Sequence, residues 1–299
     1  MHILFLALVL IHSVYANNFP ALDGQKAIYG KDDRSFVNFK SSSMINELSK
    51  SIALIISKES VDKKIILSTI EAQLLSNHNG INLCLDEKFA NHHTLNSCTG
   101  FLIAPDLVAS AGHCFMNSSD CENKLIAFNV RLKNEVSNGY EIFNRNVYEC
   151  SEIVSNVFDS SGLQDYAIIR LKKKVKDFKP LKLRSKGTVT TYDKVFMIGH
   201  PMGLPLVVTN STTINDNSNE YFFKATLNSF EGNSGSPVFN ARTFEVEGIL
   251  VRGEEDFIQN QPEQCYLYQV YEQGTKEIPT IKGEGVNRIN VIQSFVKAN

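Results

Sequence analysis

The sequence predicts an all-β protein. Short apolar runs alternate with turn clusters along most of its 299 residues, in the same style in both halves. The runs of the first half are residues 51–56 (SIALII), 99–104 (TGFLIA), 107–111 (LVASA), 125–132 and 166–171 (YAIIRL). Those of the second half are residues 194–198, 205–209, 221–227, 237–239 and 244–251. Many short strands at this spacing are typical of a β-sandwich or β-barrel.

Two stretches depart from this style and predict helices. Apolar residues in 62–77 recur at a spacing compatible with one helix, and the chain ends on a similar pattern. The residues concerned are Ile65, Ile66, Ile70, Leu74 and Leu75, then Val286, Ile289, Ile292 and Phe295. We therefore expect a C-terminal helix packed on the β body. Residues 172–187 are basic and contain Pro180, which indicates a connection between two β units.

The composition is that of a soluble globular protein, with 43% hydrophobic and 21% charged residues. The formal net charge of −2 lacks the basic excess of a nucleic-acid-binding protein. The three consecutive lysines at 172–174 are local and indicate a solvated loop. No nucleic-acid partner is expected.

Residues 1–16 resemble a secretory signal peptide. The apolar run 3–11 is too short to span a bilayer, and small or apolar residues precede a cleavage site after Ala16. The segment before the run carries His2 and no Lys or Arg, and the alternative is a buried N-terminal strand. We expect a secreted protein, extracellular or periplasmic, with no membrane attachment after the signal is removed.

The six cysteines suggest disulfides, because an even number in an exported chain is typical of them. Six cysteines allow 15 pairings, and spacing alone does not choose among them. No pair has CxxC spacing. The adjacent His92 and His93 would point to opposite faces of an extended chain. Neither a metal nor a cofactor is expected.

Residues 231–240, EGNSGSPVFN, place two serines among glycines just before an apolar run. They form either a tight turn entering a strand or a loop that presents a nucleophile. A nucleophilic serine needs a base, a group that orients the base, and donors for the oxyanion. Glycines leave backbone N–H groups unobstructed. The pattern G-x-S-x-G is not met, because Ser236 stands where its last glycine belongs.

Candidates for the other two groups lie earlier in the chain. His113 follows two predicted strands and stands among small residues, where a ring can be fixed. Asp165 begins the apolar run DYAIIRL, where a carboxylate can be partly buried and orient an imidazole. Taken alone, each residue is more often structural. All three at the ends of predicted β elements, in the order His, Asp, Ser, predict a catalytic triad.

At this point the sequence resembles the chymotrypsin-like serine peptidases, and is most similar to the bacterial branch that includes the glutamyl endopeptidases. The three segments that resemble the family's signature blocks are SCTGFLIAPDLVASAGHC, QDYAIIRL and GNSGSPVFN, in that order between Ser97 and Asn240. The segments IYGKDDR and IGHPMGLP are also similar to that branch. The resemblance implies two antiparallel six-stranded β-barrels with the site in the cleft between them.

The resemblance also implies a role for each site residue. Ser234 would be the nucleophile, His113 the general base and acid, and Asp165 the group that orients it. The N–H groups of Gly232 and Ser234 would form the oxyanion hole. A disulfide between Cys98 and Cys114 would fix the loop that carries His113.

The expected organisation has four segments. They are a signal peptide (1–16), an N-terminal or pro segment (17–47), a first barrel with His113 and Asp165 (48–178), and a second barrel with Ser234 and the C-terminal helix (179–299). We also hypothesise a Cys121–Cys150 disulfide. Cys84 and Cys265 stay unassigned.

One departure concerns activation. Asn233 precedes the expected nucleophile, where animal trypsin-like enzymes have an aspartate that pairs with a new N-terminal ammonium. A neutral amide cannot form that ion pair, so activation by this route is not expected. Trimming near Lys26-Ala27-Ile28 remains open.

The substrate pocket is expected at Asn228, Ser229, Val251, Arg252 and Gly253. Asn228 at the base is not acidic, so a trypsin-like preference for Lys or Arg is not supported. Arg252 could favour acidic side chains through charge-assisted hydrogen bonds. The three acids at 254–256 could neutralise it, and Leu250 stands where a glutamyl-specific pocket has histidine. The preference therefore stays open.

The sequence thus predicts an exported, monomeric serine endopeptidase that acts on protein or peptide substrates. Two alternatives remain. An inactive binding protein of the same fold would be expected to have lost a triad residue or the oxyanion glycine, and neither is replaced. An esterase with the same triad would hydrolyse esters without cleaving peptides.

Overall fold

The structure is a computed structural model that describes residues 27–80, 82–159, 161–271 and 283–297. The predicted signal peptide and the start of the predicted 17–47 segment lie outside the described residues. The boundaries of the four expected segments stay a prediction.

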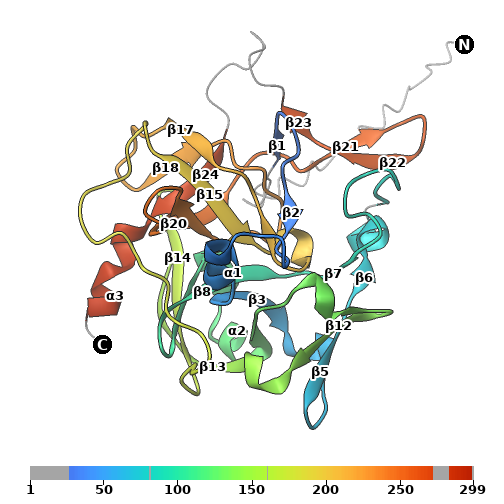
Figure 1. Ribbon diagram of the computed structural model, residues 1–299, viewed down its shortest axis with the longest axis horizontal. Helices are drawn as coiled ribbons and strands as arrows, with labels where there is room; N and C mark the ends of the chain where they lie inside the picture. The colour runs from blue at the N-terminus through green and yellow to red at the C-terminus, as the bar shows by residue number, and fades with distance from the viewer. Residues whose placement is uncertain (1–26, 81, 160, 272–282, 298–299) are drawn as a thin grey trace, which may run out of the picture.

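Six antiparallel strands form a closed first barrel, in the lower half of Figure 1. In barrel order they are β3 (Ile52–Ser57), β8 (Cys98–Ala104), β9 (Leu107–Ser110), β14 (Asp165–Leu171), β13 (Val147–Phe158) and β10 (Lys124–Phe128). Their apolar runs, IALII in β3 and YAII in β14 among them, are buried. Closure leaves no unpaired edge in this ring of strands.

Six more strands form the second barrel, in the upper half of Figure 1. They are β15 (Lys194–Gly199), β17 (Thr212–Asp216), β18 (Phe222–Ala225), β24 (Glu284–Arg288), β20 (Val246–Arg252) and β19 (Pro237–Asn240). Pairing of β15 with β17 closes the ring. The strands β16 (Val207–Val208) and β2 (Ser35–Phe36) extend the sheet beyond it.

Smaller elements decorate the barrels. A four-stranded sheet contains β4 (Val61–Lys63), β5 (Leu67–Glu71), β12 (Gly139–Phe143) and β11 (Glu135–Val136). Three two-stranded sheets pair β1 (Ile28–Tyr29) with β23 (Val270–Tyr271), β21 (Phe257–Asn260) with β22 (Cys265–Tyr268), and β6 (Gln73–Leu74) with β7 (His93–Thr94). The α-helices are α1 (Ser43–Ser49), α2 (Ser118–Asn123) and α3 (Gln293–Lys297). The 3-10 helices are Lys58–Ser60, Leu75–Gly80, Gly112–Phe115, Leu132–Asn134, Asn144–Asn146, Pro201–Gly203 and Ile289–Ile292.

One apolar core joins the two barrels. Phe101 and Ile168 of the first barrel belong to the same buried cluster as Phe239 and Ile249 of the second. Burial of this shared surface stabilises the contact between the barrels. The predicted fold class, two antiparallel six-stranded barrels with a short C-terminal helix, is confirmed.

The helix predicted over 62–77 is wrong. This segment forms β4, β5, β6 and the start of a 3-10 helix. Ile65 and Ile66, which suggested a helical face, lie in the turn between β4 and β5 with exposures of 97% and 67%. Pairing of β5 with β4 and β12 overrides the apparent helical spacing.

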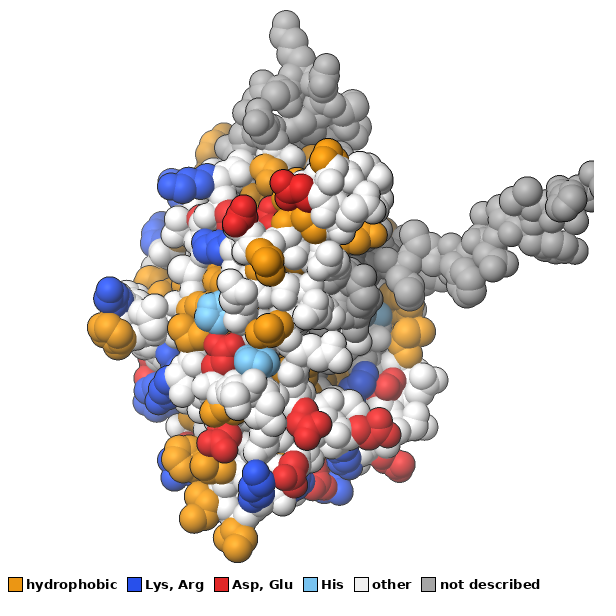
Figure 2. Space-filling view, turned by 90° about the vertical axis from the view of Figure 1, so that its right-hand side faces the viewer, with side chains coloured by type: hydrophobic (Ala, Val, Ile, Leu, Met, Phe, Trp, Pro, Cys, Tyr) orange, Lys and Arg blue, Asp and Glu red, His pale blue; other side chains and the backbone are white. Residues whose placement is uncertain are grey.

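Hydrophobic side chains project at the lower end of the molecule in Figure 2, where charges of both signs are interspersed.

The C-terminal helix begins later than predicted. Val286 belongs to β24, Ile289 and Ile292 to a 3-10 helix, and only Phe295 to α3. Ile289 and Ile292 are buried in the shared core. None of the described helices is long and apolar enough to cross a membrane.

Three disulfides link all six cysteines. They are Cys98–Cys114, Cys121–Cys150 and Cys84–Cys265. The first two are pairs expected above. The third closes the longest loop, with a sequence separation of 181, and ties the segment before β7 to β22.

Candidate active site

His113 lies at the end of β9, in the 3-10 helix Gly112–Phe115. Small residues lead into this helix because the chain is crowded there. A Cβ on Gly112 would lie 2.2 Å from the carbonyl oxygen of Val157. The next residue, Cys114, is tied to Cys98 at the start of β8. Both ends of the short His113 segment are therefore fixed by β strands.

A buried carboxylate holds His113. Asp165 begins β14 and is 3% exposed. Its Oδ2 lies 2.7 Å from Nδ1 of His113, and its Oδ1 accepts the backbone N–H groups of His113 (3.1 Å) and Gly112 (2.5 Å). With the carboxylate ionised, Nδ1 carries the proton and Nε2 has a free lone pair. This histidine can therefore accept a proton at Nε2.

Asn287 in β24 supports Asp165 from the second barrel. Its Oδ1 accepts the backbone N–H of Asp165 at 2.8 Å, and its Nδ2 donates to the carbonyl oxygens of Leu163 (2.9 Å) and Tyr221 (3.3 Å). Asn287 is fully buried. The position of Asp165 thus depends on both barrels.

The serine loop between β18 and β19 has an unusual backbone. Gly232 and Gly235, on either side of Ser234, have φ angles of +86° and +88°. Only glycine adopts this region readily. A Cβ on Gly235 would lie 2.1 Å from the carbonyl oxygen of Thr99, and one on Gly232 would lie 2.7 Å from that of His200. Both glycines are thus required by conformation and by close approach.

Thr99 in β8 brings the serine loop to the first barrel. Its backbone N–H donates to the carbonyl oxygen of Ser234 at 2.8 Å, and its hydroxyl donates to that of Gly232 at 2.8 Å. Its own carbonyl oxygen accepts the hydroxyl of Ser110, at the end of the strand that leads to His113. The loop of Ser234 therefore lies against the strands that position His113.

The Gly232 N–H can serve as an oxyanion donor. No described residue accepts a hydrogen bond from it. Donors that point at a site without a protein acceptor can stabilise charge that develops on a substrate.

The second serine of the loop is structural. Ser236 is fully buried, and its hydroxyl donates to Oδ1 of Asn233 at 3.4 Å. Nδ2 of Asn233 donates to the hydroxyl of Ser229 at 3.1 Å. The amide of Asn233 is thus satisfied within the loop and does not require an ammonium group.

His200 is buried behind the serine loop. Its Nδ1 lies 2.8 Å from the carbonyl oxygen of Leu204, so the neutral ring donates there. Its backbone N–H donates to the hydroxyl of Thr99 at 3.1 Å. Burial lowers the pKa of His200 to about 4, because the charged imidazolium would lose its hydration.

The expected pocket residues Asn228 and Ser229 bind the N-terminal segment. Oδ1 of Asn228 accepts the backbone N–H of Tyr29 at 2.7 Å, and its Nδ2 donates to the carbonyl oxygen of Lys31 (2.9 Å) and to Oδ1 of Asp33 (3.0 Å). The N–H of Ser229 donates to the carbonyl oxygen of Ala27 at 3.1 Å. The polar groups of Asn228 are therefore occupied by the protein itself.

The other expected pocket residues lie along and just beyond β20. Val251 is fully buried, whereas Arg252 and Gly253 are partly exposed. The guanidinium of Arg252 lies 5.3 Å from the ring centre of Phe222. Its Nη1 would lie 3.8 Å from a Cβ on Gly162, in the loop before Asp165. Arg252 thus faces the loop that precedes the carboxylate.

Tyr29 also meets a buried acid. Its hydroxyl donates to Oε1 of Glu284 at 3.1 Å, and burial together with this carboxylate raises the pKa of the phenol. Because β1 runs beside β23, a segment near the N-terminus and one near the C-terminus build this region together.

Two groups of potential metal ligands contain cysteine. One joins Cys98 and Cys114 with His113, and the other joins Cys84 and Cys265 with Glu263. The sulfurs in each group are bonded to each other, so they do not offer the thiolates that bind metals.

His92 and His93 converge on one carboxylate. Glu135 lies 2.8 Å from Nδ1 of His92 and 2.9 Å from Nδ1 of His93. The prediction that the two rings point to opposite faces is wrong, since His92 lies in the bend before β7 and only His93 belongs to the strand. The Nε2 of His93 lies 3.2 Å from the carbonyl oxygen of Ser137.

Sequence reasoning missed Thr99, Asn287 and Tyr29. Thr99 lies inside a recognised block, SCTGFLIA, but a threonine in a strand carries no signal of its own. Asn287 interrupts an apolar stretch near the C-terminus, which could have marked it as a buried polar residue with a dedicated partner. Nothing in the sequence indicates that Tyr29 contacts Asn228.

Two β-barrels that meet at a histidine–aspartate pair and a glycine-rich serine loop define the chymotrypsin-like class of proteins. Residues 98–249, just over half of the chain, match the family described as trypsin-like peptidase domain. The chain therefore belongs to this family of peptidases, as its resemblance implied. No curated protein matches the sequence.

Solved structures share the fold at low sequence identity. A Glu endopeptidase in complex with MPD is 15% identical with a TM-score of 0.51, covering 91% of this chain and 100% of that chain. The VesB protease of Vibrio cholerae is 12% identical with a TM-score of 0.51, and the match covers 89% of this chain and 66% of that chain. The scabies mite inactivated protease paralogue S-I1 is 15% identical with a TM-score of 0.51, and the match covers 86% of this chain and 96% of that chain. These likenesses show the fold.

Proposed function

We propose that the protein is an exported serine endopeptidase in which Ser234, His113 and Asp165 form the catalytic triad. The family supports a hydrolase that acts on protein or peptide substrates. Three disulfides are compatible with an extracellular or periplasmic location.

In the proposed reaction, the Ser234 hydroxyl attacks the scissile carbonyl carbon while Nε2 of His113 takes its proton. The Nδ1–H of the resulting imidazolium stays bonded to Asp165, whose negative charge stabilises it. The N–H groups of Gly232 and Ser234 donate to the oxyanion of the tetrahedral intermediate.

His113 then gives its proton to the leaving amine, and the peptide bond breaks to leave an acyl group on Ser234. Water enters, loses a proton to His113 and attacks the acyl carbon. Collapse of the second tetrahedral intermediate releases the carboxylic acid and restores the Ser234 hydroxyl. No cofactor takes part in this scheme.

The observation that carries the proposal is the contact of 2.7 Å between Nδ1 of His113 and Oδ2 of Asp165, with the carboxylate buried. A buried carboxylate fixes one tautomer of the ring, which is what a general base for serine requires. The loop of Ser234, tied to Thr99 beside the strand that leads to His113, supports the same assignment.

Two single substitutions test the nucleophile. Ser234→Ala should lower kcat for a peptide substrate by several orders of magnitude, about 10⁶-fold in a comparable triad. Ser236→Ala is the matched control, two residues away in the same loop, and should keep most of the activity in correctly folded protein. The reverse result would overturn the assignment of Ser234, and ester turnover without peptide cleavage would favour an esterase.

A further inference from the structure

Two of the described arginines are buried, and one of them is paired with a carboxylate. Arg34 is 1% exposed, and its Nε and Nη2 lie 2.9 and 2.8 Å from the two carboxylate oxygens of Asp32. Arg184 binds the fully buried carboxylate of Glu247 through both Nε and Nη2. A buried charge is costly unless an opposite charge or a sufficient set of hydrogen bonds compensates it.

Arg288 is the other buried arginine. It ends β24 and is 6% exposed, and no described carboxylate lies within ion-pair distance. Its Nη2 donates to Oδ1 (2.6 Å) and the carbonyl oxygen (3.3 Å) of Asn217 and to the carbonyl oxygen of Asn219 (2.8 Å), and its Nε donates to that of Asn219 (3.2 Å). All these acceptors are neutral. Its Nη1 is buried and has no hydrogen-bond partner among the described residues.

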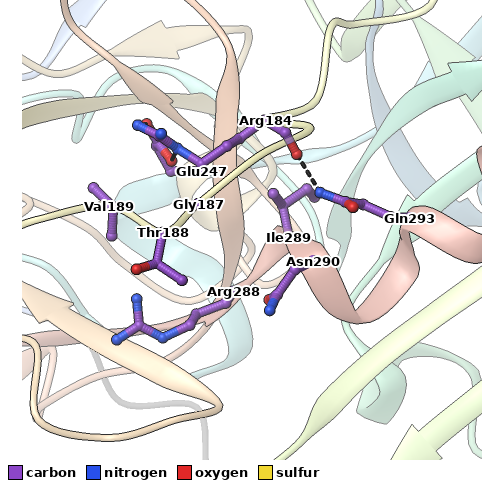
Figure 3. A pocket seen from close by; sticks show the side chains of 9 residues that line it. All are labelled: Arg184, Gly187, Thr188, Val189, Glu247, Arg288, Ile289, Asn290 and Gln293. Atoms are coloured by element: carbon purple, nitrogen blue, oxygen red, sulfur yellow. Dashed lines mark hydrogen bonds and ion pairs between the residues drawn. The ribbon is translucent and has the colours of Figure 1, made fainter.

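Arg288 lines a small pocket beside the second barrel's strands β20 and β24 (Figure 3). Arg184 and Glu247 stand together on one side of the pocket, and Thr188 lies on the side of the Arg288 guanidinium. The space open to the centre of a water-sized sphere is about 10 Å³. That volume holds about one water molecule or one ion of similar size.

The charges around the pocket do not balance. Arg184 and Glu247 neutralise each other, so Arg288 leaves the group with one positive charge in excess. Burial lowers the pKa of Arg288 despite the attraction of Glu247. Desolvation therefore disfavours the charged form of this guanidinium.

We propose that this pocket binds a monoatomic anion of chloride size, held by Nη1 of Arg288. One water molecule would accept a hydrogen bond from Nη1 but would leave the positive charge of Arg288 uncompensated. The narrow space favours a small anion over a carboxylate or sulfate ion. A small halide meets both requirements, since it accepts hydrogen bonds and carries the missing negative charge.

The first test is thermal unfolding in sodium chloride and in sodium gluconate at equal ionic strength. An anion bound only by the folded state raises the melting temperature as its concentration exceeds the dissociation constant. At a tenfold excess we expect a rise of about 3 °C or more. Sodium bromide should act like chloride. Equal melting temperatures in all three salts would overturn the proposal.

Substitutions locate the effect. Arg288→Gln should remove the difference between chloride and gluconate. Thr188→Asp places a carboxylate at the edge of the pocket and should also remove it, while raising the melting temperature in gluconate. Thr188→Asn is its neutral control and should keep the response to chloride. A chloride response that persists in both Arg288→Gln and Thr188→Asp would contradict a site at Arg288.

Crystals of the unaltered protein grown or soaked in bromide provide a test that needs no variant. An anomalous peak within hydrogen-bond distance of Nη1 of Arg288 is the expected result. An electron-density peak at this position without anomalous signal would mean that water alone occupies the pocket. That result would overturn the proposal. None of these measurements depends on peptidase activity.

Discussion

Asp165 holds His113 at two points, accepting Nδ1–H of the ring at 2.7 Å and the backbone N–H at 3.1 Å. One buried carboxylate therefore fixes both the chain and the ring of the proposed base. The same Oδ1 also accepts the N–H of Gly112. The tautomer of His113 depends on this single side chain.

Replacement of this carboxylate by an amide should preserve the fold and remove catalysis. Asp165→Asn keeps the shape of the side chain but can hold the wrong tautomer of His113, so we expect kcat to fall by about 10⁴-fold. Steady-state peptide hydrolysis measures this. Asp106→Asn, in a partly exposed ion pair with Arg170, is a control that should leave kcat within about twofold. A loss of less than tenfold in Asp165→Asn would count against the triad.

The proposed oxyanion hole depends on the backbone at Gly232. Gly232→Ala places a Cβ 2.7 Å from the carbonyl oxygen of His200 and 2.8 Å from the backbone nitrogen of Met202. The loop must then shift, and the N–H of residue 232 moves away from the developing charge. We expect a 10²- to 10³-fold loss of kcat.

Gly187→Ala is the matched control for Gly232→Ala. Gly187 also has a positive φ, +65°, but nothing lies within 4 Å of its added Cβ. This substitution should cost about 1–2 kcal/mol of stability through backbone strain and leave kcat unchanged. If both alanine variants kept full activity in folded protein, Gly232 would have no part in the oxyanion hole.

The disulfides Cys98–Cys114 and Cys121–Cys150 should stabilise the protein by similar amounts but should differ in their effect on activity. Cys98–Cys114 and Cys121–Cys150 span 16 and 29 residues, so the chain-entropy model gives each about 3–4 kcal/mol. Only the first includes the neighbour of His113. We expect removal of Cys98 and Cys114 together to lower kcat as well as the free energy of unfolding, measured in urea. Removal of Cys121 and Cys150 should lower stability alone.

His200 should make the protein sensitive to acid. Its pKa is about 4 in the folded state and about 6.5 when unfolded, so the unfolded state binds a proton first as the pH falls. Stability is therefore lost between pH 6.5 and pH 4, by about 3 kcal/mol in total. His200→Asn places its amide nitrogen near the position of Nδ1, so it keeps a donor for the Leu204 carbonyl and should reduce this loss. Urea unfolding at pH 6.5, 5.5 and 4.5 measures the slope, and equal slopes in both proteins would contradict the prediction.

The fold class could be predicted, and a candidate triad could be proposed, because the signals of both are local. The apolar pattern of a run such as TGFLIA or YAIIRL predicts a strand without reference to the rest of the chain. His113, Asp165 and Ser234 lie at the ends of such runs. The glycines of the serine loop indicate positive φ angles, because glycine is favoured where φ is positive. Gly232 and Gly235 are both at φ near +90°.

Features that depend on distant pairing could not be predicted. The 12-residue strand β13 was missed because irregular register at two points breaks its alternation of apolar and polar residues. Ile65 and Ile66 mimicked a helical face although they lie in an exposed turn. The contacts of Asn228 with Tyr29 and of Asp165 with Asn287 join residues 199 and 122 positions apart, and no local pattern records them.

Labelling by an organophosphonate probe tests the central claim most directly, because the probe reacts with a serine hydroxyl only when a base and an oxyanion site activate it. The account predicts one adduct per molecule, mapped to Ser234 by mass spectrometry, and no adduct after heating or in His113→Ala. An unlabelled folded protein, or an adduct on Ser236 or any other residue, would contradict it.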